Sequence, residues 1–96
     1  MKVDITARHF SPSGNLKKMI CEKMEKILKF NVGIIRSRVI LTKESTNIEK
    51  VEVIIHLKGK DFIAVESSDN FEKSLIIVID KIITQVKKRH DRLIKH

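Results

Sequence analysis

Basic side chains recur along the segment DKIITQVKKRHDRLIKH, residues 80–96, at the spacing of a helix. At 100° per residue, one stripe holds Lys81, Lys88, Arg92 and Lys95, and Arg89 lies on its flank. Lysine and arginine side chains grouped in this way bind phosphates, and they read the shape of a nucleic-acid backbone more than the identity of its bases. The pattern predicts binding to a polyanion; the alternative is a solvated charged helix face.

No residue pattern typical of catalysis accompanies these bases. The sequence lacks a phosphate-binding loop, the G-x-G-x-x-G and G-x-S-x-G motifs and the H-E-x-x-H motif. The histidines lack metal-ligand spacing, His56 is expected to be solvated, and Cys21 is expected to be a small packing residue on a helix flank. A small enzyme such as an acylphosphatase would need a glycine-rich loop that the three glycines do not provide. We therefore predict no catalytic residue, no metal and no cofactor.

Charge is unevenly distributed along the 96 residues, whose formal net charge is +8. The basic excess lies in residues 13–30 and 71–96, whereas acids and bases balance in residues 31–70. Such an excess favours nucleic acid, an anionic membrane or an acidic protein as the partner. The first residues, MKVDITARHF, contain no apolar run long enough for a signal peptide or a membrane span. With a single cysteine in the chain, we expect a cytoplasmic protein that does not bind membranes.

The elements that position these bases follow from the hydrophobic period. Residues 2–7 alternate between apolar and polar, which predicts a strand. Apolar residues then recur every three or four positions from Leu16 to Leu28. This spacing predicts a helix that begins after an N-cap at Ser13 and ends near Phe30.

The middle of the chain returns to a period of two. One face is expected to hold Ile35, Val39 and Leu41 from one strand and Val51, Val53, Ile55 and Leu57 from the next. A third strand, DFIAVES, follows a tight turn at Gly59-Lys60. The opposite face would gather Ile40, Ile54, Ile63 and Val65. An apolar patch of this kind leaves a protein-interaction domain open as an alternative function.

The closing segment predicts a second helix, which either Asp69 or Asn70 can cap. A cap at Asp69 would place Glu72 in a capping box. The apolar face is expected to hold Phe71, Leu75, Val78, Ile79, Ile82, Val86 and Leu93, while Ile77 falls outside it. The order β-α-β-β-β-α predicts a single α+β domain, residues 1–96, with one four-stranded mixed sheet and two helices packed on one face. Both basic helix surfaces then point to the same side.

The full chain resembles the family of short ribosome hibernation promoting factors, which includes the ribosome-associated inhibitor A. The resemblance runs from DITARHFSPSGNLKKMICEKMEKILKF through VILTKE and the strand at residues 51–57 to DNFEKSLIIVIDKIITQVKKRHDRLIKH. It implies the same fold, which is similar to that of double-stranded-RNA-binding domains. It also implies that the protein catalyses no reaction and binds the small ribosomal subunit in the channel of messenger RNA and of A- and P-site transfer RNA.

The resemblance also implies particular RNA contacts. The positions that match are Lys23 and Lys26 on the first helix and Lys81, Lys88, Arg89 and Arg92 on the last. The positions that depart are Thr84, where the family often has Arg, Glu72, where it often has Tyr, and Ile76, where it often has an acid. Long members of the family carry a further C-terminal dimerisation domain, and because the 96 residues end before such a domain, we expect the short form.

Ribosome hibernation is the function that we expect from these observations. The protein would block translation and promote inactive ribosomes, dimerised or stored, in stationary phase or stress. Its partners would be the small ribosomal subunit and its ribosomal RNA, without a small-molecule substrate, and the free protein would be a monomer. The alternative is a generic double-stranded RNA-binding module with the same basic face. Base stacking is a poor candidate for the main binding mode of either function, because the chain has four phenylalanines and no tyrosine or tryptophan.

Overall fold

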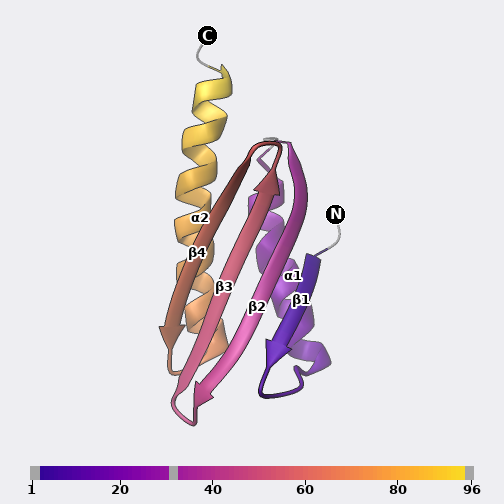
Figure 1. Ribbon diagram of the computed structural model, residues 1–96, viewed down its shortest axis with the longest axis vertical. Helices are drawn as coiled ribbons and strands as arrows, with labels where there is room; N and C mark the ends of the chain where they lie inside the picture. Colours follow the sequence, from indigo (N-terminus) through magenta and orange to yellow (C-terminus); the bar gives the residue numbers. More distant parts are fainter. Residues whose placement is uncertain (1–2, 31–32, 95–96) are drawn as a thin grey trace.

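The computed structural model describes the backbone of residues 3–30 and 33–94, and their side chains as far as Lys88. The elements in chain order are β1 (Val3–Arg8), α1 (Gly14–Leu28), β2 (Ile34–Ser45), β3 (Ile48–Leu57), β4 (Lys60–Ser68) and α2 (Phe71–Ile94). They form one sheet in the order β1-β2-β3-β4, with β1 parallel to β2 and the other pairs antiparallel. Both helices lie behind this sheet (Figure 1). The predicted α+β architecture is confirmed.

The parallel pairing of β1 and β2 requires the chain to cross back between them, and α1 makes this crossing. The helix begins at the predicted N-cap, where the Ser13 hydroxyl accepts a hydrogen bond from the backbone N–H of Leu16 at 3.1 Å. Its apolar stripe buries Ile20, Met24 and Ile27. This burial fixes which way the polar side of α1 faces, and so where its lysines lie.

The hydrophobic core fills the space between the helices and one face of the sheet. We call this sheet face the helix face and the other the open face. The core side chains of α2 are those predicted, with Phe71, Leu75, Val78, Ile79, Ile82 and Val86 all buried. The side chain of Leu93 lies outside the described residues. Burying this row holds α2 along β4 and β3 and leaves its basic stripe outward.

One residue of β2 does not lie where the alternation predicts. Ile35 was expected on the core face with Val39 and Leu41, but its side chain is 66% exposed. The pairing with β3 shifts between Ile34 and Arg36, so that Ile35 is an extra residue in the strand. Ile34 packs against the core in its place.

Both hairpins are tight. The second turn consists of Lys58 and Gly59, one residue earlier than predicted, because Leu57 already pairs with Lys60 across it. Gly59 has a φ of +76°, a conformation that costs glycine little. Beyond this turn α2 continues alone, and its last turns rise past the end of the sheet (Figure 1). The backbone that carries Arg89 and Arg92 therefore belongs to a projecting helix.

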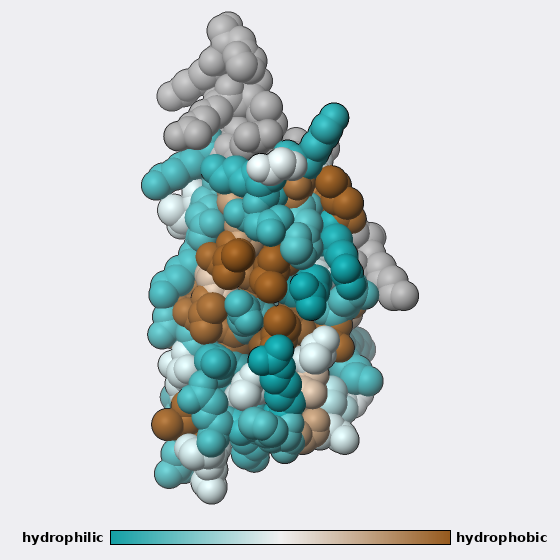
Figure 2. All heavy atoms as spheres, viewed as in Figure 1, coloured by the Kyte–Doolittle hydropathy of each residue, from teal (hydrophilic) through white to brown (hydrophobic). Residues whose placement is uncertain are grey.

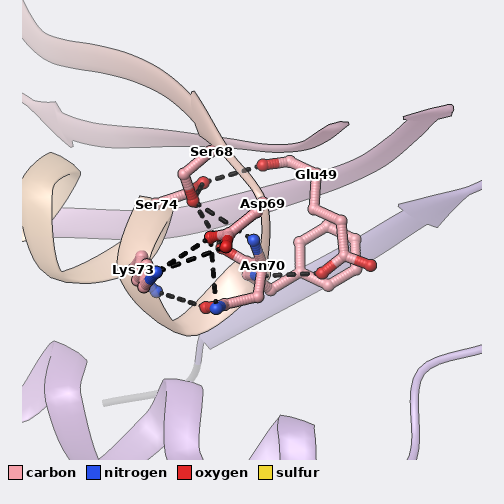
Figure 3. A network of polar contacts seen from close by, with 7 residues as sticks. Glu49, Ser68, Asp69, Asn70, Lys73 and Ser74 are labelled. Carbon is pink, nitrogen blue, oxygen red and sulfur yellow. Dashed lines mark hydrogen bonds and ion pairs between the residues drawn. The ribbon is translucent and has the colours of Figure 1, made fainter. Parts of the chain in front are cut away.

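The start of α2 is held by a network of polar contacts (Figure 3). The Asn70 side-chain oxygen accepts a hydrogen bond from the backbone N–H of Lys73 at 2.8 Å. Asn70 is therefore the cap, and Asp69 instead makes an ion pair with the Lys73 ammonium at 3.2 Å. The Ser74 hydroxyl donates to the backbone carbonyl of Glu49 at 2.7 Å, which joins the first turn of α2 to β3.

Candidate RNA-binding surface

The predicted bases of α1 lie beside α2. Lys23 is half-buried and Lys26 is exposed, and both line a small hollow between the helices with Ile76, Ile79 and Asp80 of α2. The fold therefore brings the α1 pair next to the last helix, as the expected packing of both helices on one face requires. Asp80 is the acid that lines this hollow, but no ion pair joins it to either lysine.

The predicted bases of α2 differ in their surroundings. Lys81 is exposed, and its ammonium nitrogen lies 2.6 Å from a carboxylate oxygen of Glu66 on β4. Lys88 is exposed as well, and it follows Val86, the last buried residue of α2 among the side chains described. The side chains of Arg89 and Arg92, and all of Lys95, lie outside the described residues, although the backbone of α2 extends to Ile94.

Ion pairs divide the lysines along α2. Lys73 is paired with Asp69 and Lys81 with Glu66. Within the described part of the chain, by contrast, Lys23, Lys26, Lys87 and Lys88 have no acid within ion-pair distance. On the helices, the positive charge available to an outside anion therefore lies mainly on α1 and on the C-terminal part of α2.

The contact between Glu66 and Lys81 was not expected from the sequence. The hydrogen bond from the Lys81 ammonium, and the attraction between the two charges, hold the pKa of the Glu66 carboxyl below its ordinary value. One helical turn further on, the Gln85 side-chain amide donates to the backbone carbonyl of Ile63 at 3.2 Å. Both contacts fasten α2 to β4, the strand at the edge of the sheet. A signal existed, because alternation along DFIAVES places Glu66 on the same face as Phe62 and Ala64.

The open face carries balanced charge. Its charged side chains, among the residues described, are the acids Asp4, Glu44, Glu52 and Asp61 and the bases Arg8, Arg36, Arg38 and Lys50. Several of them neutralise one another at short range. Asp4 lies 2.7 Å from Arg36, and Glu44 lies 3.2 Å from Lys50. A polyanion therefore gains little from this face, in contrast to the surface of the helices.

Apolar side chains gather in the middle of the open face (Figure 2). Ile63 and Val65 of β4 are 50% and 44% exposed, and Ile54 beside Ile63 is half-buried. Ile40, the fourth member of the expected patch, is only 7% exposed. The predicted patch therefore exists, but its exposed part is confined to β4 and β3.

Two expectations about single residues were wrong. His56 is not a solvated histidine: its Nδ1 lies 2.9 Å from the Asp61 carboxylate, and its Nε2 is buried without a hydrogen-bond partner. Cys21 is exposed and does not pack, because it lies one position past Ile20 and faces away from the core.

The described residues offer little support for other kinds of site. Among the side chains that the structure describes, in residues 3–30 and 33–88, no group of three or more His, Cys, Asp or Glu is placed to hold a metal ion. Within residues 3–30 and 33–94, neither helix has the length and apolar character that crossing a membrane requires. A hollow of about 540 Å³ lies between the first turns of the helices. Its charged lining residues are Glu49, Glu72 and Lys73, and Lys73 is already paired with Asp69, so the hollow does not favour phosphate.

Comparison with solved structures identifies the fold. A ribosomal subunit interface protein from Coxiella burnetii superposes with a TM-score of 0.82 at 22% identity, covering 92% of this chain and 96% of that one. The N-terminal domain of Protein Y from Thermus thermophilus gives 0.81 at 17% identity, covering 92% and 98%. Comparison with curated proteins gave no match.

The sequence was also compared with models of protein families. The model described as "Sigma 54 modulation protein / S30EA ribosomal protein" matches residues 3–94, which span both helices and all four strands. The resemblance found in the sequence is thereby confirmed. The chain belongs to the Sigma 54 modulation protein / S30EA ribosomal protein family.

Proposed function

We propose that this protein is a ribosome hibernation factor that binds the small ribosomal subunit in the channel of messenger RNA and of A- and P-site transfer RNA. Bound there, it blocks translation by occupying the channel and promotes inactive ribosomes in stationary phase or stress. It acts in the cytoplasm as a single domain of residues 1–96, monomeric when free, and catalyses no reaction. Membership of a ribosome-associated family supports the general assignment.

The observation that carries the proposal is the difference between the two sides of the molecule. On the helices, Lys23, Lys26 and Lys88 are without a described acid partner, whereas the charges of the open face balance. Ribosomal RNA presents closely spaced phosphates, and cations that are not already neutralised bind them most strongly. The helix surface is therefore the side that we assign to ribosomal RNA.

The proposed contacts come from both helices. They are Lys23, Lys26, Lys81, Lys88, Arg89 and Arg92. The projecting end of α2 suits a channel, because a helix that extends past its sheet reaches phosphates that a flat surface cannot (Figure 1). Six phosphate contacts would give a log–log salt slope of about −4 to −5.

Matched charge reversals test the assigned side. The double variant Lys26→Glu with Lys88→Glu removes the same charge as Arg8→Glu with Arg38→Glu, which lies on the open face. Co-sedimentation with small subunits, measured over a range of salt concentrations, should show weaker binding and a shallower slope for the first variant only. Equal losses in both variants would mean that net charge, and not the helix surface, determines binding.

A generic double-stranded RNA-binding module is the alternative. It would share the fold and the basic surface, so mutation of the lysines does not separate the two functions. Competition does: an unrelated duplex RNA in molar excess should leave a hibernation factor on the small subunit, whereas it would displace a generic module. Cryo-electron microscopy of the bound particle would then locate the protein in or outside the channel.

A further inference from the structure

Glu66 forms an ion pair with Lys81, which is one of the proposed RNA contacts. Its carboxylate lies 2.6 Å from the Lys81 nitrogen, and the two side chains are 30% and 52% exposed. Glu66 belongs to β4, on the helix face, and β4 is the sheet edge along which α2 lies. The pair therefore sits at the border of the surface that we assign to ribosomal RNA.

The carboxylate of Glu66 competes with phosphate for the ammonium group of Lys81. An ammonium group has three donors, so Lys81 can bind a phosphate while it keeps Glu66, but the phosphate then lies close to a second negative charge. The lowered pKa of Glu66 means that this charge is present throughout the neutral range. Lys81 is thus a weaker phosphate ligand than Lys88, which has no described acid beside it.

The pair is not needed to place α2 on the sheet. Leu75, Val78 and Ile82 of α2 are fully buried, and the Gln85 amide binds the edge carbonyl of Ile63 one turn after Lys81. Removing the charge of Glu66 should therefore leave the helix where it is. This separates an electrostatic role of Glu66 from a structural one.

We propose that Glu66 is a built-in competitor for phosphate at Lys81, which lowers the affinity of the helix surface for RNA. The inference rests on the proposed function, because it takes Lys81 as a contact of ribosomal RNA. It assigns to Glu66 a regulatory effect on that contact: the affinity of the natural chain is set below the value that its lysines alone would provide.

A neutral substitution of nearly the same size tests the proposal. Glu66→Gln should bind small subunits about two- to fivefold more tightly at low salt, the range expected when one exposed charge pair is removed. Glu52→Gln changes the net charge equally on the open face and should bind like the natural chain. Thermal unfolding of each variant shows that the fold is kept. A Glu66→Gln variant that binds equally or more weakly would overturn the proposal.

A double-mutant cycle shows whether Glu66 acts through Lys81. Lys81→Met should weaken binding, and adding Glu66→Gln to it should give no further gain. A full gain in the Lys81→Met background would overturn the proposal, because Glu66 would then act elsewhere. If Lys81→Met binds normally while the Lys26 and Lys88 reversals weaken binding, the inference fails and the proposed function stands. If none of these lysine variants affects binding, the proposed function fails as well.

Discussion

The carboxylate of Glu49 on β3 accepts a hydrogen bond from the backbone N–H of Phe71 at 2.8 Å, although 22 residues separate the two in the chain. The N–H groups of a first helical turn have no partner inside the helix, and a negative charge there is favoured by the helix dipole. Glu49 thus supplies from the sheet what the helix itself lacks (Figure 3). It fixes the point beside β3 at which α2 begins.

Replacing Glu49 by alanine should lower the free energy of unfolding by about 1–2 kcal/mol, the range of a lost helix N-terminal cap. Glu49→Gln keeps an acceptor oxygen and should lose about half as much. Urea unfolding followed by circular dichroism measures both. Equal losses in the two variants would show that the charge, and not the accepted hydrogen bond, stabilises the helix start.

The sequence allowed either Asp69 or Asn70 as the N-cap of α2, and in the structure Asn70 is the cap. Asn70→Ala removes the acceptor for the Lys73 N–H and should cost about 1 kcal/mol of stability. Asp69→Ala removes an exposed ion pair with Lys73 and a long hydrogen bond donated by the Asn70 amide, and it should cost less than about 0.5 kcal/mol. The midpoints of urea unfolding compare the two, with Asn70→Asp as the control that keeps a capping oxygen. A larger loss for Asp69→Ala would mean that the cap is at Asp69.

The order of the elements and most of the core could be predicted from the hydrophobic period, because burial imposes it on every helix and strand of this sheet. The position of Ile35 could not, since an inserted residue reverses the alternation and depends on how β2 pairs with β3. The choice between Asp69 and Asn70 could not be predicted either. It depends on contacts that Glu49 makes from a distant strand.

The basic surface was predictable to the level of a stripe. Helical spacing placed Lys81 and Lys88 together on the outside of α2, and both are exposed. That Lys81 has an acid partner and Lys88 has none among the described residues was not predictable. It depends on how α2 lies against β4, which brings Lys81 to Glu66. His56 was missed for a similar reason, since its partner Asp61 lies across a strand pair.

The same substitution, isoleucine to alanine, can be compared at Ile82 and Ile77, which lie on opposite sides of α2. Ile82 is fully buried, whereas Ile77 is 40% exposed. Ile82→Ala should cost about 2–5 kcal/mol, because it leaves a cavity in the core. Ile77→Ala should cost less than about 1 kcal/mol. Equilibrium unfolding in urea measures the difference, and similar losses at the two positions would contradict the described burial of α2.

The pairing of Glu66 with Lys81 should be visible in the titration of the carboxyl carbon of Glu66 by NMR. The folded-state pKa lies below the ordinary glutamate value, so the pair stabilises the fold above that ordinary value and stops doing so as the pH falls through the lowered pKa. Lys81→Ala should raise the pKa of Glu66 toward its ordinary value. An unchanged titration in this variant would show that Lys81 is not the cause of the shift.

Substitutions of Lys88 and Lys73 test which end of α2 contributes to ribosome binding. Lys73 is already neutralised by Asp69, whereas Lys88 has no described acid partner and lies where α2 leaves the sheet. Lys88→Ala should therefore make the log–log salt slope of small-subunit binding shallower by about 1, the effect of one lost phosphate contact. Lys73→Ala, which removes the same charge, should leave the slope nearly unchanged. Co-sedimentation at several salt concentrations measures both slopes. A larger change for Lys73→Ala would place the RNA contact at the first turn of α2, and the assigned surface would then be wrong.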